Sequence, residues 1–482
     1  PLKMGNSSSS SSKKKGVAAA DDANANASAV MVAVSNASVR APPDNAHCSH
    51  LASSARTASR ILQSLSSEKR VALLFRIADL LEERTNTIMA ANADDVARAD
   101  AQGTLPPATR QRLALKEGKI KQVAAGTRAV ARQQEPIGRV VRRCKVMDDD
   151  EHGSGSLTLE KVTAPMGVLL VIFEARPDAL PQIASLALKA GNGALLKGGR
   201  EATQSNKAIH ACIAQALTEF GVPPACITLV DTRDEVDGLL ACHDTIDMVV
   251  PRGSNQLCTY VMENTKIPVL GHADGVCHVY VDKAADPLKA NRILVDAKTD
   301  YPAACNAAET CLVHMDHFAN PHGYGHRLLN KLGEEGIKVL AGPRMRAIPG
   351  CAQLPTAEDM HVEYGDLTLM MEVVDDVDAA IAHINTNSSS HTECVVTEDE
   401  AVREKFLNAV DSACVFANCS TRFSDGFRFG LGAEVGISTS RLHARGPVGI
   451  EGLLTTKTYI RGGGHVVAKD ATNKYAHEEL PL

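Results

Sequence analysis

The middle of this chain alternates between short apolar runs and amphipathic stretches, and no other feature constrains its fold as strongly. Helical stretches separate the runs, for example 208–217, where Ile209, Ile213 and Leu217 fall on one face. Strands that are apolar on both faces and separated by helices form a parallel, doubly wound sheet, which binds ligands beyond the carboxyl ends of its strands. The runs that predict the first sheet are 168–173, 194–197, 227–230, 246–250 and 267–270.

A second series of the same kind begins after Gly275 and predicts a second α/β domain that faces the first. Residues 52–102, ahead of both series, have a helical pattern. The runs assigned to the second sheet or its loops are 277–282, 300–310, 367–374, 392–397 and 413–416.

The stretch 133–165 predicts a long hairpin, in which 139–146 and 157–163 flank a polar turn. Residues 455–467 offer a strand that can pair with this hairpin. An arm of this kind serves in oligomer contacts, although the pattern fits a plain surface hairpin equally well.

Composition narrows the class of protein. Of the 482 residues, 44% are hydrophobic and 22% charged, which is ordinary for a globular protein, and a net charge of -6 without a basic stripe argues against a nucleic-acid partner. The most apolar stretch, 166–173, is shorter than the roughly 20 residues that cross a bilayer. The thirteen cysteines show neither paired spacing nor a CxxC cluster, so we expect free thiols in a reducing compartment, no metal and a cytoplasmic protein.

Residues 1–47 differ from the rest, with a serine tract followed by Lys13, Lys14 and Lys15. This composition predicts a disordered tail or linker, or a cloning remnant. If Met4 were the initiator, the following residues would match an N-myristoylation signal and predict a membrane tether. An organellar location is the other alternative to the cytoplasm.

Cys305 lies in the run DYPAACNAAET, which spans 300–310. The Tyr301-Pro302 pair favours extended backbone before it, and Ala307 to Glu309 suit a first helical turn. A thiol at a helix start has a lowered pKa and lies beside free N–H groups, which suits a catalytic nucleophile. The competing interpretation is a small buried hydrophobe.

Other motifs carry weaker signals. Lys197, Gly198, Gly199 and Arg200 follow a predicted strand and suit a phosphate, or are a simple turn. Gly253 and Ser254 open a predicted helix. They suit the binding of a pyrophosphate, and the alternative is a plain turn in which the serine caps the helix.

Arg176 lies at the end of the first predicted strand. It suits the binding of a substrate carboxylate or phosphate, and the alternative is a structural ion pair. His272 and His391 are candidates to activate a thiol, or are ordinary loop histidines.

Taken together, the motifs resemble the gamma-glutamyl phosphate reductase family of the aldehyde dehydrogenase superfamily. The resemblance covers residues 51–482 and rests on long strings such as FEARPDALPQIASLALKAGNGALLKGGREA, PRGSNQL, GHADGVCHVYVD, DYPAACNAAET and EYGDL. FEARPD and GNGALLKGG are closest to the reductase half of the bifunctional delta-1-pyrroline-5-carboxylate synthases. The chain is therefore expected to be a stand-alone enzyme or a fragment of such a synthase.

The resemblance implies a domain plan. An NADPH-binding domain would span 48–275 with the oligomerisation hairpin at 133–165, and a catalytic domain would span 276–442. Residues 443–482 would return to the cofactor domain and add an oligomerisation strand. A homo-oligomer is implied, with a glutamate 5-kinase as a further partner.

The resemblance also assigns residues. Cys305 would be the nucleophile, Lys197 would hold the adenine-side ribose, Gly253 and Ser254 the pyrophosphate side, and Glu363 the nicotinamide ribose. Arg200, three positions after Lys197, replaces a glutamate that disfavours a 2′-phosphate elsewhere in the superfamily, which favours NADPH. Arg176, Asn306 and Arg422 are candidates for substrate contacts.

The expected reaction is reduction of L-glutamyl 5-phosphate to L-glutamate 5-semialdehyde in proline biosynthesis, through a thioester on Cys305. Ordinary aldehyde dehydrogenases have a water-activating glutamate about thirty-four positions before the cysteine. Here residues 271–274 read GHAD and include no glutamate, which suits an enzyme whose acyl group accepts hydride and not water. A hydrolytic or CoA-acylating aldehyde dehydrogenase and a non-catalytic scaffold are the rival functions.

Overall fold

The computed structural model describes residues 45–103, 105, 107–116, 118–149, 154–230, 232–467 and 475–482. The predicted disordered tail and the myristoylation signal at Met4 therefore lie outside the described residues, apart from positions 45–47. Asp44–Leu482 form one compact unit.

The described chain begins with a helical layer, as the pattern over 52–102 predicts. Ser66 caps the second of these helices by accepting from the Lys69 N–H, and Leu73, Leu74 and Ile77 turn inward from it. Near the amino terminus the helices are α2 (Asn45–Ser64), α3 (Ser67–Glu83), α4 (Thr85–Gln102), α5 (Pro107–Leu113) and α6 (Lys119–Arg132).

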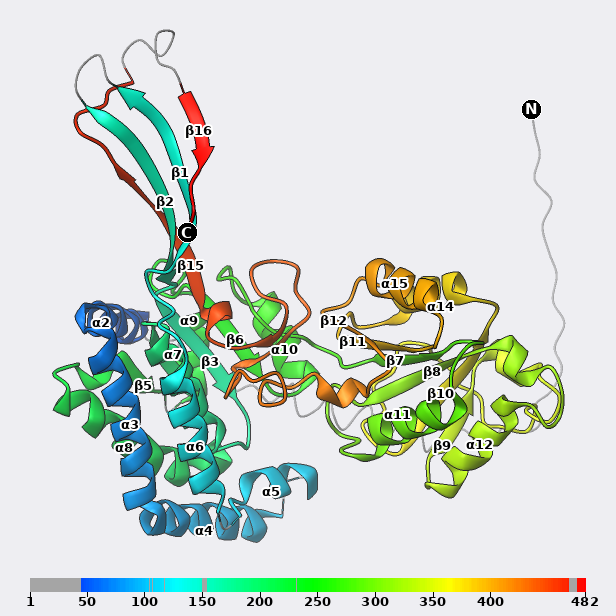
Figure 1. Cartoon of the computed structure of the whole chain (residues 1–482). Helices are drawn as coiled ribbons and strands as arrows, with labels where there is room; N and C mark the ends of the chain where they lie inside the picture. The colour runs from blue at the N-terminus through cyan, green and yellow to red at the C-terminus, as the bar shows by residue number, and fades with distance from the viewer. Residues whose placement is uncertain are drawn as a thin grey trace, which may run out of the picture. The chain divides into compact units, whose positions relative to one another are not determined.

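The first sheet is parallel, with strand order β5-β4-β3-β6 (Figure 1). Along β3, Leu169 and Val171 enter one apolar core and Leu170 and Ile172 enter another, so both faces are buried. This alternation confirms the doubly wound arrangement. The elements are β3 (Val168–Phe173), α7 (Ala179–Lys189), β4 (Gly193–Lys197), α8 (Thr203–Glu219), β5 (Ile227–Leu229), α9 (Arg233–Leu240), β6 (Met248–Arg252) and α10 (Asn255–Glu263).

The second sheet is also parallel, with strand order β12-β11-β7-β8-β10-β9. It too has two cores, one holding Val279 and Val313 and the other Tyr280 and Leu312. The elements are β7 (Cys277–Val281), α11 (Pro287–Thr299), β8 (Ala308–His314), α12 (Tyr324–Glu334), β9 (Lys338–Ala341), α13 (Pro343–Arg346), β10 (Thr368–Val374), α14 (Val377–Asn387), β11 (Thr392–Val396), α15 (Glu400–Ala409) and β12 (Cys414–Ala417).

A third, antiparallel sheet has the order β15-β2-β1-β16 and stands out as a ribbon in Figure 1. It confirms the predicted hairpin and its pairing with a carboxyl-terminal strand, and β16 is an addition that sequence reasoning missed. We call this sheet the arm; its strands are β1 (Val140–Asp149), β2 (Gly155–Pro165), β15 (Leu454–Arg461) and β16 (Tyr475–Glu479). A short ladder joins β13 (Gly436–Ser438) to β14 (Gly446–Val448).

Two local predictions were wrong. Residues 307–309 do not begin a helix, because Ala308 starts strand β8, which is buried along its whole length between β7 and β10. Tertiary burial on both faces overrides the local helix preference of the alanines. The run 267–270 is not a full strand and contributes only a bridge between Val269 and Val249.

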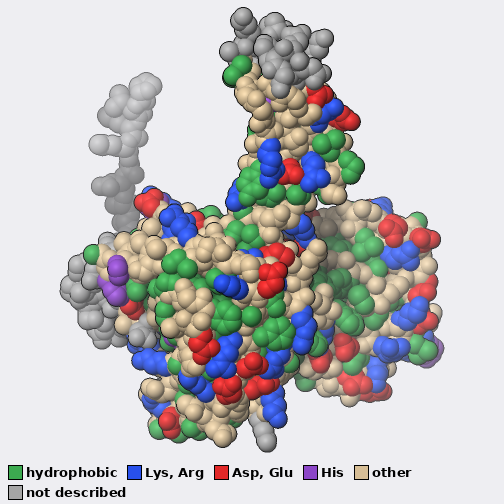
Figure 2. Space-filling view, turned by 60° about the vertical axis from the view of Figure 1, so that its left-hand side comes forward, with side chains coloured by type: hydrophobic (Ala, Val, Ile, Leu, Met, Phe, Trp, Pro, Cys, Tyr) green, Lys and Arg blue, Asp and Glu red, His purple; other side chains and the backbone are tan. Residues whose placement is uncertain are grey.

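On the face drawn in Figure 2, Lys and Arg side chains are interspersed with Asp and Glu and form no basic stripe. Among the described residues, no helix has the length and apolar character needed to cross a membrane.

Candidate active site

A cavity of about 490 Å³ brings most of the predicted site residues together. Its wall comes from the turns after β3 and β6, the turn before β8, and loops near 272 and 434. We call this cavity the catalytic cleft. The predicted residues that line it are Arg176, Gly253, Ser254, Cys305, Asn306, Glu363 and Arg422, whereas Lys197 and Arg200 do not.

Cys305 lies in the turn between α11 and β8, beside two histidines. The ligand atoms of Cys305, His272 and His391 all lie within 4.8 Å of one another, and the two imidazole rings pack edge to face with centroids 4.9 Å apart. The Cys305 and Asn306 N–H groups donate to no protein acceptor within the described ranges. Such free donors beside a nucleophile suit an oxyanion.

The tautomer of His272 follows from its second contact. Its Nδ1 lies 2.8 Å from the carbonyl oxygen of Ile437 in β13. Because a carbonyl oxygen can only accept, Nδ1 carries a hydrogen, and Nε2 is left to take the proton of the Cys305 thiol. This is the arrangement of a nucleophile with an oriented base.

Electrostatics at the sulfur favours a thiolate. Burial alone would raise the pKa of Cys305, but the charge of His391 and the hydrogen bond to His272 outweigh it and lower that pKa well below its usual range. Burial works against the charged form of His272, yet its contacts with Cys305 raise the pKa of His272 to about 9. Both shifts favour the thiolate form of Cys305 and the imidazolium form of His272.

These contacts correct the predicted origin of the lowered thiol pKa. No helix begins at Cys305, so a helix dipole does not act there, and two histidines distant in sequence supply the effect instead. His272 and His391, the predicted candidates to activate a thiol, both lie beside the sulfur. The same three side chains match the soft ligand set of a zinc ion, a cluster that sequence spacing did not reveal.

Gly275 and Glu363 fix the other side of the sulfur. A Cβ on Gly275 would lie 2.3 Å from the Cys305 carbonyl oxygen, so the position admits glycine alone. The Gly275 N–H donates to Glu363 at 3.0 Å. Beneath the loop that carries Glu363, the Lys298 ammonium lies 2.6 Å from Glu309 in a fully buried pair, and Glu309 also accepts from the Gly365 N–H. The predicted nicotinamide-side glutamate is therefore held by Gly275, which packs closely against Cys305.

The turn from β6 into α10 binds a carboxylate of the protein itself, that of Glu174. The Ser254 N–H donates to the Glu174 carboxylate at 3.0 Å, and the Ser254 hydroxyl caps the helix at Leu257. A Cβ on Gly253 would lie 2.5 Å from the same carboxylate. Because Glu174 is exposed and a carboxylate stands in for a phosphate oxygen, the donors here fit a pyrophosphate once Glu174 moves aside.

Lys197 and Arg200 lie at the carboxyl end of β4, outside the wall of the catalytic cleft. Lys197 is buried and Arg200 is exposed. The neighbouring Glu201, which sequence reasoning missed, accepts a hydrogen bond of 2.5 Å from the Ala175 N–H.

The three predicted substrate contacts divide into two kinds. Asn306 donates from Nδ2 to the Ser424 carbonyl at 2.8 Å and accepts from Arg422, which also pairs with Asp300 at 3.0 Å. Asn306 and Arg422 are therefore engaged with the protein. Arg176, by contrast, makes no side-chain hydrogen bond or ion pair with any residue the structure describes.

Sequence reasoning also missed Glu434, Arg112 and Tyr301, all of which line the catalytic cleft. Glu434 lies near Cys305, and burial raises the pKa of Glu434 above its ordinary value. Neither spacing nor local pattern pointed to these residues, because distant segments bring them to the cleft.

Comparisons with known proteins identify the family of this chain. The aldehyde dehydrogenase family model matches residues 34–321. Over 442 residues the chain is 51% identical to delta-1-pyrroline-5-carboxylate synthase A of Arabidopsis thaliana, a match that covers 92% of this chain and 60% of the plant protein. It is 47% identical over 416 residues to gamma-glutamyl phosphate reductase of Synechococcus sp. (strain WH7803), covering 86% of this chain and 93% of that protein.

A crystal structure of gamma-glutamyl phosphate reductase from Thermotoga maritima has a TM-score of 0.80 and 35% identity to this chain, and the match covers 86% of this chain and 99% of that one. The chain thus spans about three fifths of the length of the plant synthase and nearly all of the stand-alone reductases. The fold class and the family expected from the sequence are confirmed. The chain belongs to the aldehyde dehydrogenase family and, within it, to the gamma-glutamyl phosphate reductases.

Proposed function

We propose that this chain reduces L-glutamyl 5-phosphate to L-glutamate 5-semialdehyde and phosphate with NADPH, as a step in proline biosynthesis. The observation that carries the proposal is the Cys305 sulfur of the catalytic cleft, whose ligand atom lies within 4.8 Å of those of His272 and His391. The names of the similar reductases support the substrate.

Cys305 is the proposed nucleophile. Its thiolate attacks the acyl carbon, the two N–H groups of Cys305 and Asn306 stabilise the oxyanion, and the bond to the phosphate oxygen breaks. Phosphate leaves with that electron pair and needs no strong acid, and a thioester on Cys305 remains.

The family implies a nicotinamide cofactor, and the donors at Ser254 together with Lys197 and Glu363 suit it. Bound NADPH would supply the hydride that reduces the thioester carbonyl. The resulting thiohemiacetal oxyanion collapses to the aldehyde and expels the Cys305 thiolate, which the His272 imidazolium stabilises as a leaving group.

Hydrolysis of the thioester would need a base that activates water, and the carboxylates that line the cleft accept hydrogen bonds from the backbone. Glu174 accepts from Ser254 N–H, Glu363 from Gly275 N–H, Asp425 from Phe427 N–H and Glu434 from Gly426 N–H. Residues 271–274 read GHAD and supply no glutamate where hydrolytic aldehyde dehydrogenases place this base, so we expect hydride transfer to outrun water attack.

We further propose NADPH over NADH, on the ground that the Arg200 cation follows the strand that ends in Lys197. For partners, we propose a homo-oligomer through the arm, where the side chain of Ile460 is 60% exposed, and a glutamate 5-kinase. The proposed compartment is the cytoplasm.

The reverse reaction tests the function directly. We expect the purified chain to reduce NADP with glutamate 5-semialdehyde only when inorganic phosphate is present, and Cys305→Ser to bind NADPH yet lose nearly all turnover. Cys277→Ser is the matched control, since Cys277 is a buried thiol beside the same turn. Semialdehyde oxidation that proceeds equally without phosphate would identify a hydrolytic dehydrogenase instead.

A further inference from the structure

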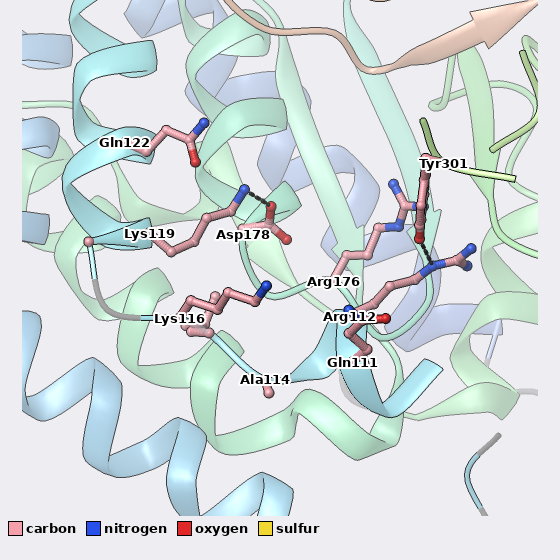
Figure 3. Close-up of a pocket in the computed structure, with 11 residues that line it drawn as sticks. Gln111, Arg112, Ala114, Lys116, Lys119, Gln122, Arg176, Asp178 and Tyr301 are labelled. Carbon is pink, nitrogen blue, oxygen red and sulfur yellow. Dashed lines mark hydrogen bonds and ion pairs between the residues drawn. The ribbon is translucent and has the colours of Figure 1, made fainter. Parts of the chain in front are cut away.

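A second cavity of about 590 Å³ shares part of its wall with the catalytic cleft. Figure 3 shows the side chains that line this second cavity. We call it the cationic pocket. Tyr301, which lines both cavities, begins the turn that carries Cys305. Arg112, Arg176 and Tyr301 line both cavities; Lys116, Lys119 and Asp178 line the cationic pocket alone.

The charge of the cationic pocket is unbalanced. Its wall holds two arginines and two lysines, and among the described lining residues Asp178 is the one carboxylate. Lys119 lies 3.0 Å from Asp178 Oδ2 and neutralises it in part, as Figure 3 shows. Cations crowded together without matching anions favour a negatively charged ligand.

Arg176 is the cation of this pocket whose surroundings most favour an anionic ligand. Ala175, just before it, has a left-handed φ of 42°, a strained conformation for alanine that the Glu201 hydrogen bond holds and that directs the following residue. Burial, together with the guanidinium groups of Arg252 and Arg112, lowers the pKa of Arg176 below its ordinary value. Within the described part of the chain its side chain has no protein partner, so the guanidinium is placed for a bidentate contact with an anion.

The proposed chemistry decides which part of the substrate reaches this pocket. The phosphate is bonded to the carbon that Cys305 attacks, so it must lie in the catalytic cleft. The other end of the glutamyl chain bears a carboxylate and an ammonium, and in an extended conformation these begin about 5 Å from the reacting carbon. A neighbouring pocket that holds both cations and one carboxylate matches this zwitterionic end.

We propose that the cationic pocket binds the α-amino-acid end of the substrate, with Arg176 on the α-carboxylate and Asp178 on the α-ammonium. The inference rests on the proposed function. Arg112, whose Nε lies 3.3 Å from the Tyr301 hydroxyl, flanks the carboxylate. Asp178 Oδ1 accepts no hydrogen bond from the described residues, and this oxygen is the acceptor for the ammonium.

Three aldehydes of similar length test the assignment in the phosphate-dependent reverse reaction. Glutamate 5-semialdehyde has both charged groups, 5-oxopentanoate lacks the ammonium, and pentanal lacks both. For the native chain we expect kcat/KM to fall in that order. The Asp178 side chain makes no cap to α7, so Asp178→Asn should leave the fold unchanged.

Asp178→Asn is expected to lower kcat/KM for glutamate 5-semialdehyde about tenfold or more and to leave 5-oxopentanoate unchanged, since a lost charged hydrogen bond is worth roughly 1.5–3 kcal/mol. Arg176→Gln should lower kcat/KM for both aldehydes that carry a carboxylate and leave kcat/KM for pentanal unchanged. The KM for inorganic phosphate should be unchanged in Asp178→Asn. Arg110→Gln, on the same helix as Arg112 but paired with Asp100 outside the pocket, is the matched control.

Other results would overturn the assignment. A raised KM for phosphate with unchanged kinetics for the aldehydes would show that the pocket takes the phosphate. If the Asp178→Asn and Arg176→Gln variants lost kcat/KM equally for all three aldehydes, these two residues would have a structural role only. If the native chain shows no phosphate-dependent turnover at all, the proposed function fails; calorimetric titration with L-glutamate then tests the pocket alone, and binding that Asp178→Asn does not weaken, or no binding, refutes it.

Discussion

Replacing His272 tests the origin of the thiolate at Cys305. His272→Asn keeps a side-chain donor for the Ile437 carbonyl but removes the imidazole that faces the sulfur. We expect the fold to be unchanged, so this variant tests the contact between the imidazole and the Cys305 sulfur.

The expected magnitude follows from the pKa of His272, which its surroundings raise from 6.5 to about 9. At 1.36 kcal/mol per pKa unit, this difference corresponds to roughly 3 kcal/mol in favour of the imidazolium, to which Cys305, Ile437 and Glu363 contribute against the cost of burial. Since His391 still contacts the sulfur, we expect a loss of thiolate between about tenfold and a hundredfold at pH 7. Catalytic efficiency, kcat/KM, should fall by a similar factor.

Alkylation of Cys305 by iodoacetamide, followed by mass spectrometry of its peptide, measures the thiolate directly. The native pKa of Cys305 is depressed, so native alkylation should be fast at pH 7 and depend little on pH above it. In His272→Asn the Cys305 pKa rises, so alkylation should be slow at pH 7 and approach the native rate as the pH increases to 10. His443→Asn, an exposed histidine outside the catalytic cleft, is the control. If His272→Asn had the native pH profile, the thiolate–imidazolium pair would not exist.

Three further outcomes are expected. Arg200→Glu should shift the ratio of kcat/KM for NADPH over NADH toward NADH by about tenfold, an energy of about 1.4 kcal/mol, and an unchanged ratio would remove the role of Arg200. Glu174→Gln should tighten NADPH about two- to fivefold in a fluorescence titration, because it removes a charge worth about 0.3–1 kcal/mol at the start of α10; equal or weaker binding would contradict a competing carboxylate. Added Zn²⁺ should inhibit turnover, EDTA should reverse the inhibition, and His391→Asn should raise the inhibitory concentration at least about tenfold; equal sensitivity of this variant would exclude the Cys305 cluster as the zinc site.

The sequence by itself determined the two parallel sheets and the arm. Continuous apolar runs such as Val168–Phe173 demand burial on both faces, and intervening amphipathic helices leave few ways to connect them. The nucleophile and several cleft residues, such as Arg176 and Ser254, were also recognisable, since parallel strands deliver the turns after them to one edge. Within the sheets, the short strand β9 was missed because Lys338–Ala341 are too few residues to show a period.

The contacts that activate the sulfur, and the full lining of the catalytic cleft, become visible only in the folded chain. Local pattern predicted a helix after Cys305, but a place in the middle of a sheet made this segment a strand, since burial on two faces outweighs the helix preference of a few alanines. His272 and His391 are 33 and 86 positions from Cys305 in the printed sequence, and Arg112 is farther still. Electrostatic coupling falls off over a few ångströms of space and is independent of separation along the chain, so the pairing of these groups becomes visible only when the chain is folded.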